Sequence, residues 1–307
     1  MAVSLLVKKY GVRLLAVALA VMVARRVLRR KKKTVEGKTV LVTGAASGVG
    51  RSLALALAKR GAKLVLWDVQ GDQLQETRKL VEEATPSATI QTDRVNLAAP
   101  SEIYAAAERV DGYVDILINN AGIVSGNDYF TDVDMDRAEL TVRVNMLAHM
   151  HMAKAFLPGM MERDTGHIVS VASVAAFSAA SRMVDYSASK FGARGFAEGL
   201  CVELDERKSK VKVSCVCPTH INTALFQGFS HPLTPTLSID EVVQGTIDAI
   251  EYETELVLLP DRLKYLLVLG KSLQETFMYE LGVKLPIESP LTTHDRSQLN
   301  RVFDAMK

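Results

Sequence analysis

The chain has 307 residues, of which 48% are hydrophobic, so it can bury the core of one large domain or two small ones. Ten of its 37 Lys and Arg residues lie within residues 1–35, which hold no acid, and the rest of the chain holds 27 basic against 35 acidic residues. This mildly acidic body argues against nucleic-acid binding. Three cysteines, with no histidine spacing to complete a zinc site, exclude a disulfide framework and favour a reducing compartment.

The N-terminal residues 1–35 have the composition of a membrane anchor. Leu14 to Ala24 is an apolar run of 11 residues, and the basic cluster Arg25 to Lys33 follows it. A spanning helix needs about 20 apolar residues, so the segment either spans with snorkelling basic residues or lies in the membrane surface. The cluster would hold the body in the cytosol. A mitochondrial presequence is the alternative because the stretch is Arg-rich, and a cleaved secretory signal fits least.

A glycine-rich turn follows the first predicted strand. Lys38 to Val42 is a short, β-branched apolar run, the turn spans Thr43 to Gly50, and Ser52 to Lys59 is typical of an apolar helix. Strand, glycine turn and helix in this order are typical of a dinucleotide-binding unit, since the turn admits a pyrophosphate to the helix N-terminus. The alternative is an ordinary turn that happens to be rich in glycine.

Asp68 ends the second predicted strand, Lys63 to Trp67. A carboxylate there can accept hydrogen bonds from ribose hydroxyls and would repel a 2′-phosphate, which favours NAD over NADP. Arg51 is the reason to keep NADP open, although a solvated charge in the first helical turn is its simpler role.

The segment from Thr77 to Val110 is predicted to contribute the adenine side of the site. Thr77 to Ala84 is a predicted helix and Thr89 to Thr92 a predicted strand, and Ser101 to Val110 is helical again. Asp93 or Asn96 should lie beside the adenine, and the spacing to the next helix favours Asn96.

A polar pair and two small residues follow the fourth predicted strand, Val114 to Ile118. They are Asn119, Asn120, Ala121 and Gly122. Ligands of doubly wound sheets bind at this carboxyl edge of the strands.

One long helix is predicted from Asp134 to Met161. It carries Asn145, which by itself is more often a satisfied polar group, and His149 and His151, to which we assign no catalytic role.

The fifth predicted strand, His167 to Val171, is followed by Ser173, and Tyr186 comes 13 residues later. Tyr186 and Lys190 are four apart on a predicted helix, so they share one face. A neighbouring ammonium lowers the pKa of a tyrosine, which would fit Tyr186 to accept the proton of an alcohol.

The last third of the sequence is less informative. Lys212 to Cys217 is a sixth strand that ends before Pro218, and Phe226 to Leu237 is a predicted loop. A helix at 239–250 and a strand at 256–259 follow. Arg262 to Val283 could be a packing helix, a dimer arm or a second membrane contact, so a homodimer stays open.

Three motifs, T-G-x-x-x-G-x-G, N-N-A-G and Y-x-x-x-K, occur in order between Lys38 and Thr223. Together they resemble the classical short-chain dehydrogenase/reductases. Stretches such as Leu64 to Asp68, Ala155 to Pro158 and Gly166 to Val169 resemble the branch that holds retinol dehydrogenase 10 and the 17β-hydroxysteroid dehydrogenases 11 and 13. The resemblance implies an α/β fold with a doubly wound, Rossmann-type, mostly parallel sheet in one domain behind an N-terminal hydrophobic membrane anchor. We expect the anchor at 1–35, the catalytic domain at 36–285 and a polar tail at 286–307.

The resemblance also implies roles for individual residues. Ser173 would orient the substrate hydroxyl, Tyr186 would take its proton, Lys190 would lower the tyrosine pKa and bond the nicotinamide ribose, and Asn145 would hold a water linked to the lysine. The residues expected to bind the cofactor are Gly44, Ser47, Gly48, Val49, Gly50, Asp68, Asn96, Asn120, Ala121, Gly122, Tyr186, Lys190, Pro218 and Thr223. Thr219 stands where the family has a glycine. No metal is expected.

The expected function is hydride transfer between NAD and a lipophilic alcohol or carbonyl, such as a retinoid, a steroid or a fatty alcohol. The expected location is the endoplasmic reticulum membrane or a lipid droplet, with the catalytic domain in the cytosol. The alternatives are an NADP-dependent carbonyl reductase and a nucleotide-binding protein of a membrane or lipid-droplet surface with little turnover.

Overall fold

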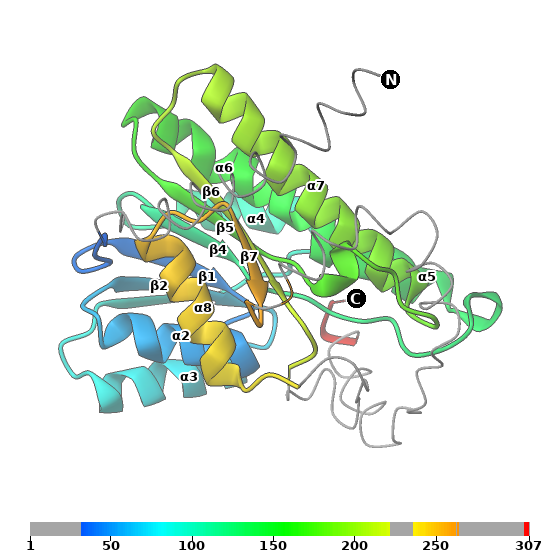
Figure 1. Cartoon of the computed structure of the whole chain (residues 1–307). Helices are drawn as coiled ribbons and strands as arrows, with labels where there is room; N and C mark the ends of the chain where they lie inside the picture. Colours follow the sequence, from blue (N-terminus) through cyan, green and yellow to red (C-terminus); the bar gives the residue numbers. More distant parts are fainter. Residues whose placement is uncertain (1–31, 222–235, 262, 264–303, 307) are drawn as a thin grey trace, which may run out of the picture. The chain divides into compact units, whose positions relative to one another are not determined.

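A seven-stranded sheet, all parallel, forms the centre of the molecule (Figure 1). The computed structural model describes residues 32–221, 236–261, 263 and 304–306. The strand order is β3-β2-β1-β4-β5-β6-β7. The strands are β1 Thr39–Thr43, β2 Lys63–Asp68, β3 Ile90–Arg94, β4 Ile116–Asn119, β5 His167–Val171, β6 Lys212–Pro218 and β7 Leu256–Leu259.

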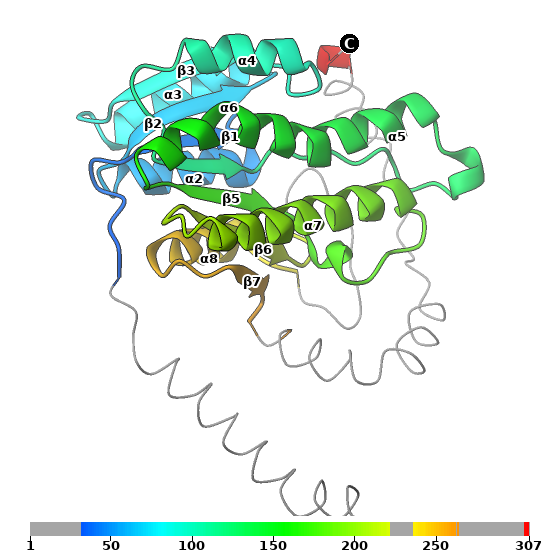
Figure 2. The ribbon, with the colours of Figure 1, turned by 90° about the horizontal axis from the view of Figure 1, so that it is seen from above.

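Helices cover both faces of the sheet (Figure 2). Helices α2 and α8 pack with β1 in one core, and α4, α6 and α7 pack in the other. Leu41 lies in the second core, whereas Val40 and Val42 lie in the first, which is the alternation expected of a strand buried on both sides. The helices are α2 Gly48–Ala58, α3 Gly71–Ala84, α4 Pro100–Glu108, α5 Met135–Val142, α6 Ala148–Glu162, α7 Val184–Glu206 and α8 Ile239–Glu251.

The predicted doubly wound α/β sheet is confirmed, and every strand pair in the described residues is parallel. Helix α3 begins at Gly71 rather than at the predicted Thr77, because the polar residues before Thr77 continue the exposed face of an amphipathic helix. The predicted helix from Asp134 to Met161 is interrupted by one π-helical turn, Arg143–Leu147.

The strand order reverses between β1 and β4. From β1 the chain proceeds outward to β2 and β3, and then returns to β4 on the other side of β1. In open α/β sheets, ligands bind at the carboxyl ends of the strands beside such a reversal. The predicted N-terminal anchor lies almost wholly outside the described residues, and none of the described helices has the length and apolar character needed to cross a bilayer.

Candidate active site

The turn after β1 and the first turn of α2 each need a glycine, at Gly44 and at Gly50. Gly44 has a φ of +67°, and a Cβ there would lie 2.8 Å from the Cα of Ala121. A Cβ at Gly50 would collide with the main-chain oxygen of Gly44. The turn therefore lies directly against the segment after β4, with its backbone open to the cleft beside them.

Asn120 fixes the segment after β4 to this turn. Its Nδ2 donates to the main-chain oxygen of Thr43 at 2.9 Å. The main-chain nitrogens of Asn120 and Ala121 donate to Thr43 Oγ1 at 3.0 and 3.1 Å. The Asn120 side chain of the N-N-A-G motif thus holds the segment after β4 in place as one wall of the cleft.

A cleft of about 420 Å³ opens at this edge of the sheet, and most of the predicted site residues line it. These are Gly44, Ser47, Gly48, Val49, Gly50, Asp68, Asn120, Ala121, Gly122, Ser173, Tyr186, Lys190 and Pro218. Asn96 and Asn145 are not among the lining residues. Thr223 lies outside the described residues, as do most of the predicted loop 226–237 and of the segment 262–283.

Sequence reasoning missed several lining residues, which are Val69, Gln70, Gln73, Val95, Leu97, Ile123, Val144, Val171, Ala172, Thr219, Ile221 and Met306. Most of them lie next to a predicted site residue or directly after a strand. Their positions at the carboxyl ends of the predicted strands could therefore have identified them. Met306 is separated from the others by a long stretch of sequence, and no local pattern points to it.

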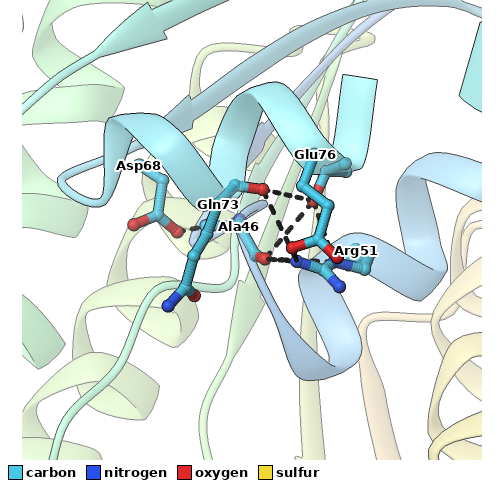
Figure 3. Close-up of polar contacts among 6 residues, drawn as sticks. Ala46, Arg51, Asp68, Gln73 and Glu76 are labelled. Carbon is cyan, nitrogen blue, oxygen red and sulfur yellow. Dashed lines mark hydrogen bonds and ion pairs between the residues drawn. The ribbon is translucent and has the colours of Figure 1, made fainter. Parts of the chain in front are cut away.

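Asp68 anchors the end of β2 to the glycine turn (Figure 3). Its carboxylate accepts hydrogen bonds from the main-chain nitrogens of Ala46 and Gln70, both at 2.9 Å. Burial raises the pKa of Asp68, and these hydrogen bonds together with the Arg51 charge act in the opposite direction. Asp68 lies on the wall of the cleft, at the carboxyl end of β2.

Arg51 is held on the far side of Ala46 from Asp68 (Figure 3). Its guanidinium donates to the main-chain oxygen of Ala46, to Thr77 Oγ1 at 2.9 Å and to Glu76 Oε2 at 3.1 Å. Arg51 does not line the cleft. Its charge is thus used to fasten α2 to α3.

Tyr186 lies in the first turns of α7 and is 5% exposed. Burial raises its pKa to about 12, and a hydrogen bond with the Ser173 hydroxyl acts in the opposite direction. This differs from the sequence-based expectation of a lowered pKa, because desolvation of the phenolate by burial outweighs the hydrogen bond from Ser173. The phenol is therefore protonated at neutral pH.

Lys190 lies one helical turn after Tyr186, with Nζ 5.7 Å from the centroid of the tyrosine ring. Nζ donates to the main-chain oxygen of Val171 at 3.1 Å. Burial lowers the pKa of Lys190 to about 8. The predicted face shared by Tyr186 and Lys190 is present, and it points into the cleft.

Ser173 lies after β5 and begins the short 3₁₀ turn Val174–Ala176, whose Ala175 nitrogen donates to its Oγ at 3.1 Å. This bond and the one with Tyr186 fix the hydroxyl on the cleft wall. The spacing of 13 residues thus brings a serine and a tyrosine together from β5 and α7.

Asn145 lies in the π turn and is fully buried. Its Oδ1 accepts from the nitrogen of Ile123 at 2.9 Å, and its Nδ2 donates to the oxygen of Ile123 and to Ser189 Oγ. All the hydrogen-bonding capacity of the amide nitrogen is thus used within the protein. The side chain positions the cleft segment after β4 against α7.

Asn96 and Thr219 both have protein partners. The amide of Asn96 donates to the main-chain oxygen of Met306 at 2.8 Å, and its Oδ1 accepts from the nitrogen of Ala98. Thr219, at the position where a glycine was expected, lines the cleft, and its nitrogen donates to the oxygen of Leu259 at 2.9 Å. A threonine is therefore accommodated at this point of the backbone.

These residues fit a dinucleotide. The glycines let the backbone of the turn pack closely beside the cleft, and the first turn of α2 carries no acidic residue, so its N-terminus favours a phosphate. A carboxylate stands at the end of β2, and a serine, a tyrosine and a lysine lie at the opposite end of the same cleft.

Comparison with known proteins agrees with this geometry. Residues 38–233 match the model of the short chain dehydrogenase family. Estradiol 17-beta-dehydrogenase 11 of Mus musculus is 39% identical over 267 residues, which cover 84% of this chain and 87% of the relative. Epidermal retinol dehydrogenase 2 of Mus musculus is 41% identical over 254 residues, with 80% and 81% of the two chains covered.

Solved structures show the same fold. A short-chain dehydrogenase/reductase from Burkholderia phymatum, in complex with NAD, has a TM-score of 0.70 at 24% identity, and covers 85% of this chain and 99% of its own. One from Sphingobium yanoikuyae, in complex with NADPH, has a TM-score of 0.67 at 26% identity, with 78% and 96% covered. The chain therefore belongs to the short-chain dehydrogenase/reductase family, as an NAD(P)-dependent enzyme of the branch that includes these 17-beta-dehydrogenase 11 and retinol dehydrogenase relatives.

Proposed function

We propose that this enzyme oxidises a lipophilic alcohol with NAD, and reduces the matching carbonyl in the reverse direction. The observation that carries the proposal is the convergence of Ser173, Tyr186 and Lys190 at one end of a cleft whose other end is a glycine turn. The two relatives are named for estradiol and for retinol, both of which are lipophilic alcohols. Retinoids, steroids and long-chain alcohols are thus the substrate classes to test.

When bound, the nicotinamide supplies the hydride acceptor, so the chain itself has to position an alcohol and move one proton. Ser173 would donate or accept a hydrogen bond at the substrate oxygen. Tyr186 would exchange the proton with that oxygen, and Lys190 would stabilise the phenolate during the exchange. Since the pKa of Tyr186 is raised to about 12, its hydroxyl is protonated at rest and holds the proton that a carbonyl substrate would receive. For oxidation of an alcohol, the buried Tyr186 hydroxyl would first have to lose its own proton.

The preference for NAD over NADP is supported by the environment of the ribose end. Asp68 places a carboxylate on the cleft wall. Because this carboxylate is buried, the added negative charge of an NADP 2′-phosphate beside it would be poorly screened by solvent. Arg51, the basic residue that could have welcomed a 2′-phosphate, is engaged by Ala46, Thr77 and Glu76.

We further propose that residues 1–35 anchor a catalytic domain of residues 36–285 to a membrane or lipid-droplet surface, with 286–307 as a polar tail. The apolar run and basic cluster of the N-terminal segment support this placement. A membrane-dissolved substrate would then be delivered at the surface where the enzyme resides.

The test is absorbance of reduced nicotinamide with detergent-solubilised full-length protein. NAD and NADP are each supplied with retinol, hydroxysteroids and long-chain alcohols, and Tyr186→Phe is the blank. Turnover with NAD that is lost in the variant supports the proposal. Turnover with NADP alone would instead favour a carbonyl reductase, and binding of NAD without any turnover would favour a nucleotide-binding surface protein.

A further inference from the structure

The C-terminal end of the described residues lies at the wall of the cleft. Residues 304–306 form a helical turn. Met306 is half-buried and lines the cleft, although it belongs to the segment 286–307, for which the sequence indicated only a polar tail. Asp304, in the same turn, is exposed. The turn therefore presents an apolar side chain to the cleft and an acidic one to solvent.

Met306 is held at the wall by a polar and an apolar contact. Its main-chain oxygen accepts a hydrogen bond from the side-chain amide of Asn96 at 2.8 Å. It also packs against the buried side chains of Ile123 and Val144. Both main-chain groups of Ile123 are hydrogen-bonded to the Asn145 side chain, so the methionine packs against a fixed surface.

The contact with Asn96 places Met306 on one particular side of the cleft. Asn96 follows Val95, whose nitrogen donates to the main-chain oxygen of Asp68 at 2.9 Å. In dinucleotide-binding sheets of this kind, the acidic residue after the second strand binds the adenosine ribose. Met306 is therefore connected, through Asn96 and the end of β3, to the side of the cleft on which the adenosine half of a dinucleotide is expected.

The wall around Met306 is apolar. Leu97, Ile123 and Val144 line the cleft together with it. These side chains carry no charge and no N–H or O–H donor, so they do not favour a phosphate or the nicotinamide amide. The two faces of a purine ring are apolar, and a methionine thioether makes favourable contacts with aromatic rings. Among the parts of a dinucleotide, the adenine base thus fits this wall best.

We propose that Met306 contacts the adenine ring of the bound cofactor, and that docking of residues 304–306 and binding of the adenosine half stabilise each other. This inference rests on the nicotinamide cofactor of the family, and it holds whichever alcohol is the substrate. Coupling between two binding events is reciprocal. The factor by which the docked turn raises cofactor affinity is therefore the factor by which the cofactor favours the docked turn.

The first test is calorimetric titration of full-length protein with NAD and with ADP-ribose, which keeps the adenosine half and lacks the nicotinamide. Met306→Gln keeps the length of the side chain and places an amide in the apolar wall. We expect it to raise the Kd for NAD and the Kd for ADP-ribose by the same factor, about three- to tenfold. A rise for NAD that exceeds the rise for ADP-ribose overturns the adenine contact, as does an unchanged Kd for both ligands.

Two further variants separate this contact from a general effect of substitution. Met306→Leu keeps an apolar side chain of similar volume, so both Kd values should stay within about twofold of the wild type. Met135→Gln is the matched control, because Met135 is an exposed methionine of α5 that does not line the cleft. It should leave both Kd values unchanged. An equal loss of affinity in Met135→Gln and Met306→Gln overturns the proposal.

The second test measures the docked turn itself and needs no turnover. Carboxypeptidase Y trims the C-terminus of full-length protein, and intact mass follows the release of residue 306. We expect saturating ADP-ribose to slow this release by about the factor found in the titrations, and to slow it less in Met306→Gln. Equal rates with and without ADP-ribose in the wild type overturn the coupling. If the wild type oxidises no alcohol while ADP-ribose protects residue 306, the dehydrogenase proposal fails and this inference stands.

Discussion

The side-chain amide of Asn96 donates a hydrogen bond of 2.8 Å to the main-chain oxygen of Met306, 210 residues further along the chain. Met306 also packs with Ile123 and Val144, both of which line the cleft. A residue close to the C-terminal end of the sequence thus forms part of the wall of the cleft, where the Asn96 amide holds it.

Removing that donor should weaken cofactor binding. Asn96→Asp keeps the acceptor for Ala98 but cannot donate to Met306, so we expect the Kd for NAD to rise about three- to tenfold, as the loss of one hydrogen bond implies. Calorimetric titration measures it. Met306→Ala should weaken binding similarly, and the double variant should add little, because both changes release the same contact. Fully additive effects would mean that the new aspartate charge acts on the cofactor directly.

Tyr186→Phe should abolish turnover without loss of cofactor. The substitution removes only the hydroxyl that we propose exchanges the proton, so we expect kcat to fall by about 10³-fold or more. The Kd for NAD should stay within about twofold of the wild type, since the ring and its packing remain. Steady-state kinetics and fluorescence titration provide the two numbers. Substantial turnover in the variant would remove Tyr186 from the mechanism.

Asp68→Asn should narrow the proposed preference for NAD over NADP. The change keeps an acceptor for the Ala46 nitrogen and deletes the charge that would face a 2′-phosphate. We expect the Kd for NADP to fall about tenfold, or 1.4 kcal/mol, and the Kd for NAD to rise modestly. Glu76→Gln is the control, because it neutralises an acid of the same region that contacts Arg51 and not the cleft. An NADP affinity that rises equally in both variants would assign the preference to net charge rather than to Asp68.

Gly50→Ala and Gly199→Ala should have opposite effects on stability. The new Cβ at position 50 meets the main-chain oxygen of Gly44, so we expect a loss of several kcal/mol or a failure to fold. Gly199 is exposed in α7, and an added Cβ there would meet nothing within 4 Å beyond the backbone of its own helix, so alanine should stabilise by about 0.5–1 kcal/mol. Urea unfolding of the two variants gives both values. A neutral Gly50→Ala would show that the turn can move away from its packed position.

His149 should make the protein sensitive to mild acid. Its pKa is about 3 in the folded chain against about 6.5 when unfolded, so between these values the unfolded state binds one more proton. The free energy of unfolding should therefore fall as the pH is lowered below about 6.5, with about 1.4 kcal/mol per pH unit from this group. The free energy of unfolding should be measured at intervals from pH 7 to pH 4. Its slope against pH should be shallower for His149→Gln than for the wild type and for His151→Gln. Equal slopes for all three would place the His149 ring in contact with solvent.

The motifs predicted the cleft well, because their spacing reflects contacts within one turn or one strand end. Gly44, Asp68, Ser173, Tyr186 and Lys190 all line the cleft as the sequence predicts. Elements that depend on burial alone, such as the strands at His167–Val171 and Leu256–Leu259, also have the predicted bounds.

The remainder depended on contacts between distant segments. The raised pKa of Tyr186 follows from the burial of its own side chain, which a pattern of residue types does not reveal. The Met306 contact joins positions with nothing in common in sequence. The capture of Arg51 by Glu76 and Thr77 required helix α3 to begin earlier than the periodicity indicated.

The π turn at Arg143–Leu147 makes the site depend on chain length as well as on residue identity. A π turn holds one residue more than the α-helical turn that it replaces. Deleting a single residue there would leave all three sequence motifs unchanged. It would also rotate α5 by about 100° relative to α6, and either Asn145 or the residues before it would lose their register with Ile123. In an aligned relative of this protein, a one-residue deletion at this point would therefore indicate a cleft of different geometry, even where the serine, tyrosine and lysine are all retained.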